Sequence, residues 1–161
     1  MKRWMNFMIL IFVLAIAAAC GTPNAEDYQK DKDAAAQVIA QFEVTQSQIT
    51  YKDPASFTKG DQYLTPEFAK QYHELRAGME QFIKDSKATV SGTDPTISFI
   101  EHDGDHFLFN FEANRTITSE ETNSSASSQV KYIVTVTKQD DGSFLISNME
   151  EPEEEAVPEG Q

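Results

Sequence analysis

The sequence has little cysteine, little positive charge and no long hydrophobic run. Its single cysteine, Cys20, leaves no partner for a disulfide and excludes a thiolate metal site. Only 13 basic residues oppose 26 acidic ones, a net charge of −13. Such a surface repels phosphate backbones and anionic headgroups, which argues against nucleic acid as a partner and against a basic membrane-binding patch. The one apolar run, from Trp4 to Ala19, is interrupted by Asn6 and is shorter than the roughly 20 residues of a membrane-spanning helix.

Catalytic and cofactor motifs are also missing. No serine lies in a nucleophile-elbow motif, and no histidine and aspartate are recognisable by spacing as its partners. Neither a phosphate-binding loop nor a dinucleotide fingerprint occurs. We therefore predict no catalytic residue, no metal site and no cofactor, and the sequence assigns no ligand-binding residue.

The N-terminus has the three parts of an export signal over residues 1–19. Lys2 and Arg3 supply the positive region, residues 8–16 the apolar region and residues 17–19 the small-residue cleavage region. Removal of this signal leaves about 140 residues, enough for one domain with a hydrophobic core. The mature chain then has 11 basic and 26 acidic residues, a net charge of −15.

The segment Ala17-Ala18-Ala19-Cys20-Gly21 resembles the lipobox of bacterial lipoproteins. The resemblance implies that Cys20 takes a diacylglyceryl group and becomes the first residue of a chain anchored on the outer face of the cell membrane. Two acyl chains on one residue give a stable anchor. Ala17 departs from the family pattern, which usually has leucine there. Two alternatives stay open: ordinary signal cleavage, and retention of the apolar run as a strained membrane helix.

A first amphipathic helix is expected from about Asp31 to Ile49, after a polar tether that occupies residues 20–32. Glu43 and Gln46 fall outside its apolar face. The residues that recur on that face are Ala35, Val38, Ile39, Phe42 and Ile49.

A second helix follows a connection over residues 51–64 that holds a short helical turn. Thr65 is placed to cap this helix, Pro66 suits its first position, and the helix should end by residues 85–87. His73 is expected on its solvated face. Its apolar stripe, expected to pack on a sheet or another helix, consists of Phe68, Tyr72, Leu75, Met79, Phe82 and Ile83.

From Thr96 the apolar period changes to two, as in half-buried strands. Four strands are predicted, over residues 96–101, 106–117, 129–137 and 143–149. Residues 118–129 lack large apolar side chains and are expected to form a mobile hairpin tip, whether idle or in contact with a partner. The acidic, proline-containing segment 150–161 is expected to be disordered.

Residues 101–106 (EHDGDH) are the only cluster with metal-ligand chemistry, with two histidines and three carboxylates of types that bind zinc. We favour the alternative that Asp103-Gly104 forms a two-residue hairpin turn, flanked by solvated polar residues. In that register His102 lies opposite Asp105 as a cross-strand pair.

Two helices followed by four strands in hairpin order predict an α+β domain over residues 33–149, with both helices on one face of a curved antiparallel sheet. This order, with the Tyr63–Phe68 run that opens the second helix, resembles the nuclear transport factor 2-like superfamily. The nearest likeness is to small membrane-tethered extracytoplasmic domains of Gram-positive bacteria, including conjugation-apparatus members. The resemblance implies a cone with a pocket between helices and sheet.

Enzymes of this superfamily place acidic, histidine or arginine residues on inward-facing strand positions. Here the inward candidates are Phe107, Phe109, Phe111, Val130, Tyr132 and Val134. They predict a filled core, which argues against catalysis.

Three function classes follow, in order of preference. The first is a non-catalytic envelope lipoprotein that binds another envelope protein, for example in conjugation machinery. The second is a small-ligand binding domain, which requires an open cavity of several hundred cubic ångströms where the first expects a solid core. The third is an enzyme, which requires a buried titratable pair in that cavity.

Overall fold

The computed structural model describes residues 25–152 of the chain, which divides into two units, residues 1–31 and 32–161. The predicted signal, Cys20 and most of the acidic segment 150–161 lie outside the described residues and stay predictions. Of the first unit, the structure describes a helical segment with an ion pair between Lys30 and Asp27 (3.8 Å). Within residues 25–152, no helix is long and apolar enough to cross a membrane.

Helix α2 spans Ala25–Gln46, so it begins earlier and ends earlier than expected. Residues 25–32, predicted as tether, are helical. Glu26 and Asp27 lie in the first turn, where negative side chains stabilise a helix by facing the positive end of its dipole. Predicted face residues such as Ile39 and Phe42 are buried. Glu43 and Gln46 are buried as well, which corrects their placement on the polar side.

The connection after α2 holds two short 3-10 helices, η1 (Pro54–Phe57) and η2 (Asp61–Tyr63). Helix α3 spans Pro66–Asp85 and begins as predicted. The Thr65 hydroxyl accepts a hydrogen bond from the backbone N–H of Phe68 (3.3 Å), which satisfies one of the free donors of the first turn.

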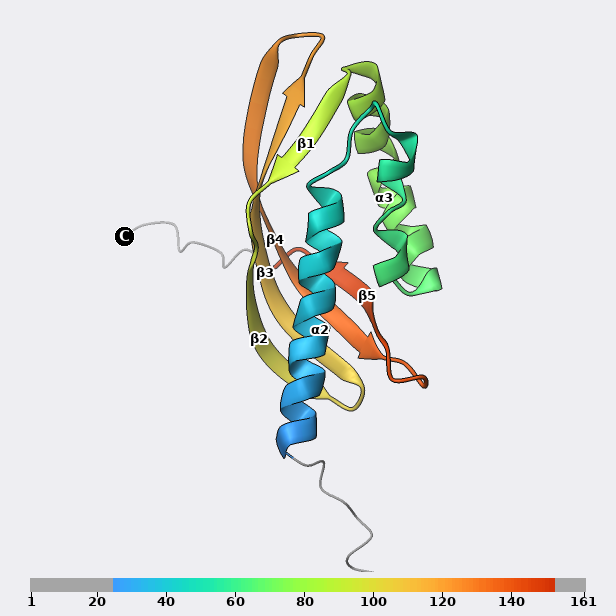
Figure 1. Ribbon diagram of the computed structural model, residues 1–161, viewed down its shortest axis with the longest axis vertical. Coiled ribbons are helices and arrows are strands. Elements are labelled where there is room, and N and C mark those ends of the chain that lie inside the picture. Colours follow the sequence, from blue (N-terminus) through green and yellow to red (C-terminus); the bar gives the residue numbers. More distant parts are fainter. Residues whose placement is uncertain (1–24, 153–161) are drawn as a thin grey trace, which may run out of the picture. The chain divides into compact units, whose positions relative to one another are not determined.

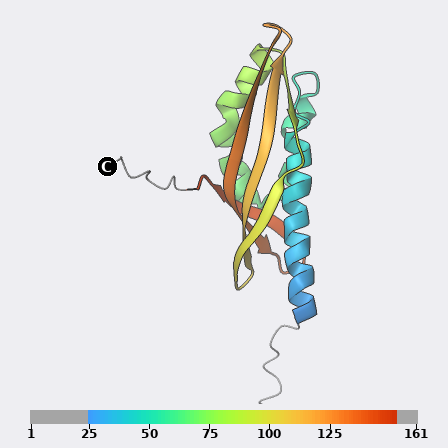
Figure 2. The ribbon, with the colours of Figure 1, turned by 90° about the vertical axis from the view of Figure 1, so that its left-hand side faces the viewer.

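Five antiparallel strands form one sheet: β1 (Ala88–Gly92), β2 (Thr96–Asp103), β3 (His106–Ser119), β4 (Ser124–Lys138) and β5 (Phe144–Glu150). The long strand β3 pairs with both β1 and β2 along one side and with β4 along the other. Residues 32–46 of α2 and all of α3 lie on the same face of this sheet (Figure 1, Figure 2). The predicted α+β class with a curved antiparallel sheet is confirmed.

The hairpin tip expected over residues 118–129 is wrong in extent. Strands β3 and β4 continue to Ser119 and from Ser124, so only residues 120–123 form the turn. Hydroxyl pairs cross the ladder, Thr116 with Ser127 (2.8 Å) and Thr118 with Ser125 (3.0 Å). Such cross-strand pairs stabilise a sheet without large apolar side chains.

The β2–β3 turn differs from the prediction by one residue. Its loop positions are Gly104 and Asp105, and His102 pairs with Phe107. Gly104 has a φ of +59°, as the first loop position of a type II′ turn requires. A register shift between Phe99 and Glu101 then returns Phe99 to the position opposite Phe109, so that aromatic rings meet on the core face.

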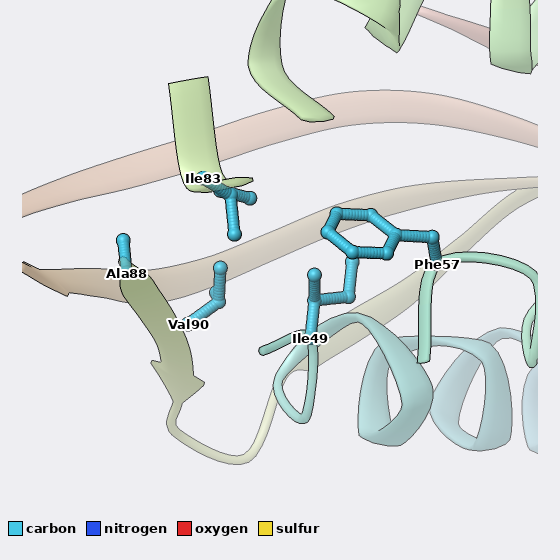
Figure 3. Close-up of a cluster of buried hydrophobic side chains, with 5 residues drawn as sticks. All are labelled: Ile49, Phe57, Ile83, Ala88 and Val90. Atoms are coloured by element: carbon cyan, nitrogen blue, oxygen red, sulfur yellow. The ribbon is translucent and has the colours of Figure 1, made fainter. Parts of the chain in front are cut away.

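The core fills the space between helices and sheet at two places. Beside β1, a cluster joins the end of α3 to the segment after α2; it consists of Ile49, Phe57, Ile83, Ala88 and Val90 (Figure 3). Along β3 and β4, four of the six predicted inward residues are fully buried, namely Phe107, Phe109, Phe111 and Val134. Val136 of β4 and Ile146 of β5 are fully buried as well. Val130 and Tyr132 are only half-buried.

Candidate ligand-binding cavity

A cavity of about 440 Å³ opens between α3 and the sheet. Helix α3 contributes Tyr72, Leu75, Arg76 and Met79 to its lining. The sheet side contributes Ile117, Val130, Tyr132 and Met149. The filled core expected at Val130 and Tyr132 is therefore wrong, because Leu75 and Met79 face them across the cavity without filling it and remain 80% and 44% exposed.

Gln46 forms the polar end of this cavity. Its buried Oε1 accepts hydrogen bonds from the Tyr72 hydroxyl (2.9 Å) and from Nη1 of Arg76. Nη1 also donates to the Tyr72 hydroxyl (2.7 Å), and the guanidinium carbon lies 5.0 Å from the centre of the Tyr72 ring, a cation–π distance. These contacts fix Arg76 against α2 and against its own helix.

Arg115, on β3, also lines the cavity, but its charge is matched. Nε donates to Oε1 of Glu43 (3.1 Å), and Nη2 donates to Oε2. The Ser47 hydroxyl donates to the same carboxylate (3.1 Å). Burial lowers the pKa of the Arg115 guanidinium, but the hydrogen bonds and charge of Glu43 more than offset this, so its pKa lies above the ordinary value. The pair is a neutral tie between α2 and β3.

Arg76 has a different environment, because its partners are neutral. Within residues 25–152 it donates hydrogen bonds to Gln46 and Tyr72 and lies over the Tyr72 ring, and no carboxylate forms an ion pair with it. Burial raises the pKa of the Tyr72 hydroxyl, and the charges of Arg76 and Arg115 lower it by less, so Tyr72 stays protonated and donates to Gln46. The cavity thus carries one cation that no described carboxylate neutralises by contact.

The clusters predicted from sequence lie elsewhere. His73 is not simply solvated: Nε2 lies 2.9 Å from Oδ1 of Asp61, and Nδ1 lies 3.4 Å from Oε1 of Glu80. In the 101–106 segment, the His102 ring lies 4.5 Å from the Phe107 ring, and Nδ1 of His106 lies 2.9 Å from the Thr137 hydroxyl. In the part of the chain that the structure describes, no group of three or more His, Cys, Asp or Glu residues is arranged to hold a metal ion.

Four polar residues at or beside the cavity were not predicted from the sequence. Three of them line it and interrupt an apolar face at the expected spacing: Gln46 follows Phe42 by four, Arg76 follows Tyr72 by four, and Arg115 follows Ala113 by two. The fourth is Glu43, the partner of Arg115. A polar residue on an apolar face was the available signal.

No protein-family model matches the sequence, and no curated protein matches it. Among solved structures, the chain is similar to an IcmL-like type IV secretion system protein from Legionella pneumophila subsp. pneumophila str. Philadelphia 1, with 11% identity and a TM-score of 0.58 over 82% of this chain and 94% of that one. It is also similar to a periplasmic fragment of TraM, with 16% identity and a TM-score of 0.53 over 75% of this chain and 94% of that fragment. The likeness is one of fold.

Proposed function

We propose that this chain is a cell-envelope lipoprotein whose domain is a non-catalytic binding module in a multiprotein apparatus such as conjugation machinery. The lipid on Cys20 holds it on the outer face of a Gram-positive membrane, and the domain is of the nuclear transport factor 2-like type. In support, the fold is shared with a type IV secretion system protein and with periplasmic TraM. Fold alone does not select a function, so a binding role requires a surface suited to a partner.

The observation that carries the proposal is an apolar stripe on α3 that the described domain leaves uncovered. Leu75, Met79 and Phe82 are 80%, 44% and 52% exposed. Their spacing of four and three residues puts them on one helix face. Large apolar side chains grouped on a surface mark interaction sites. Because the chain is strongly acidic, a partner with an apolar face and a basic rim has the matching chemistry.

A photo-cross-linking amino acid placed at position 75 tests this surface in cells. Ala77 is the matched control, since it is also exposed but lies on the opposite face of α3. We expect position 75 to form an adduct with a membrane-associated envelope protein, and Phe82→Glu to remove that adduct. Equal adducts at positions 75 and 77, or no envelope protein at position 75, would contradict the proposal.

The second candidate function is small-ligand binding, and the open cavity favours it. Its volume falls in the range of ligand sites, roughly 300–1,000 Å³, and its walls are mainly apolar with a few polar groups. An enzyme needs a titratable group free to react in that cavity. Glu43, the buried carboxylate beside it, is engaged by Arg115 and Ser47. The absence of enzyme activity stays a prediction.

A further inference from the structure

We propose that the cavity binds a small amphipathic molecule with one carboxylate and an apolar body, and that Arg76 holds the carboxylate. The proposal deepens the second candidate function and rests on it. It does not depend on a protein partner for the α3 stripe.

The guanidinium fork of Arg76 is the group that would hold the carboxylate. A guanidinium presents five N–H donors in a fixed plane that matches the two oxygens of a carboxylate. Nη1 is used by Gln46 and Tyr72, and within residues 25–152 neither Nε nor Nη2 has a hydrogen-bond partner. Gln46 and the Tyr72 ring hold the group in place before any ligand arrives. Little side-chain freedom is then lost on binding.

Arg115 provides an internal comparison for this geometry. Its Nε and Nη2 hold both oxygens of Glu43. On Arg76 the corresponding atoms have no hydrogen-bond partner among residues 25–152, although the residue lines the same cavity. In the described part of the chain, the cavity thus has one arginine fork with its carboxylate and a second without one.

The remaining walls specify the rest of the ligand. Leu75, Met79, Ile117, Val130 and Met149 surround the cavity with aliphatic side chains and thioethers. An alkyl or aryl body removes these surfaces from water, which stabilises the complex by about 25 cal/mol per Å² of apolar surface buried. A cavity of about 440 Å³ accommodates one small molecule.

Charge limits the ligand to a single carboxylate. Glu43 already neutralises Arg115, so Arg76 is the one cationic side chain of the lining that no carboxylate of residues 25–152 contacts. Glu151 also lines the cavity, and the chain carries a net charge of −13. Both disfavour a polyanion. Charge repulsion likewise disfavours the chain's own residues 153–161 as the ligand, since they include three successive glutamates.

Octanoate and its neutral analogue octanamide are suitable probes. Titration calorimetry on the full chain in mild detergent compares the native protein with Arg76→Gln. Lys70→Gln is the control, because it removes the same charge from an exposed position of α3 outside the cavity. Partition of the probes into detergent is common to all samples and cancels between proteins.

A charge-assisted pair predicts about ten- to hundredfold weaker octanoate binding to Arg76→Gln. Octanamide should bind the native chain as weakly as octanoate binds Arg76→Gln. Lys70→Gln should bind octanoate with the affinity of the native chain.

Two further variants keep the test decisive if Arg76→Gln fails to fold. Arg76→Lys retains the charge without the fork and should bind octanoate more weakly than the native chain. Met79→Trp puts a larger side chain at a half-exposed position of the wall and should block octanoate.

Equal affinity for octanoate and octanamide would overturn the role of Arg76 and leave the cavity as an apolar site. No binding of either probe would overturn the second candidate function as well. Binding only after deletion of residues 153–161 would assign the cavity to the chain's own C-terminus and overturn the proposal.

Discussion

Gln46 joins the end of α2 to the middle of α3 through one amide. Its oxygen receives the Tyr72 hydroxyl and Arg76, and its nitrogen donates to the Thr45 hydroxyl (3.3 Å). The amide has room because residue 60, in the loop that passes it, is glycine. A Cβ at position 60 would lie 2.6 Å from Nε2 of Gln46 and 2.9 Å from the Phe42 ring. A single methyl group added at position 60 would therefore press on Gln46 and disturb the polar end of the cavity.

Gly60→Ala is expected to lower the free energy of unfolding by about 1–3 kcal/mol, the usual cost of overpacking a well-filled site. Backbone strain is not the cause, since φ at Gly60 is −75°. Gly78→Ala is the matched control: a Cβ there meets nothing within 4 Å, and alanine favours the exposed helix by up to about 1 kcal/mol. Urea unfolding of both variants measures the difference. Equal stability of the two would show that the space around Gln46 adapts freely.

At the residue scale the sequence revealed apolar positions better than polar ones. Phe107, Phe109 and Phe111 were predictable because alternation along one strand is a local pattern. Glu43 and Arg115 were not, because each is tolerated in the interior only through the other, 72 positions away. Burial of a charge depends on its partner, and the partner is set by the fold.

At the scale of elements, His73 ties α3 to η2. The hydrogen bond to Asp61 raises the pKa of the His73 imidazole, burial opposes this, and Glu80 adds to the rise. The folded pKa thus lies above the unfolded value of about 6.5. Such a group stabilises the fold fully below the unfolded pKa, and the contribution is lost as pH rises through the folded pKa.

We therefore expect the native chain to have a higher free energy of unfolding than His73→Gln, and the difference to be larger at pH 5.5 than at pH 8.5. The change should be about 0.2–1 kcal/mol, since the His73 side chain is 32% exposed and solvent screens the pair. Denaturant unfolding at the two pH values measures it. Asp61→Asn should remove most of this pH dependence, and a gap that widens toward pH 8.5 would contradict the assignment.

Elements with local signals were predicted well, and elements made by distant partners were not. The start of α3 follows from Thr65 and Pro66, which act within one turn. Strand β1 has one large apolar residue, Val90, so its own sequence does not indicate a strand. It forms through pairing with β3 and through the Val90 N–H, which donates to the Ile49 carbonyl (2.8 Å). The outer part of the β3–β4 ladder, from Thr116 opposite Ser127 to Ser119 opposite Ser124, similarly arises from pairing between mainly polar segments, which composition hides.

At the scale of the whole molecule, element order determined the fold class, while the cavity had to be observed. The spacing of apolar residues along α3 predicts which side of the helix faces the sheet, but not the distance between the helix and the sheet. That separation is set by contacts at the two ends of the helix: Thr65 N–H donates to the Ile146 carbonyl (2.9 Å) at one end, and Ile83 packs beside β1 at the other. Between these fixed points the sheet and helix leave the cavity open.

The proposed lipid anchor on Cys20 would fix where this domain works, and replacement of Cys20 gives the broadest test. A thiol can carry a diacylglyceryl group through a thioether, whereas the serine hydroxyl of Cys20→Ser is not the substrate of that reaction. Cells grown with an alkyne-bearing fatty acid should label the native chain, and Cys20→Ser should show no label and should not yield a lipid-anchored mature protein. Because the mature chain would have a net charge of −15, its binding to an anionic membrane is disfavoured without the lipid. Ala17→Leu, which brings the segment nearer to the lipobox pattern, should keep the label. Mature Cys20→Ser protein that stays in the membrane fraction would show that another feature anchors the chain.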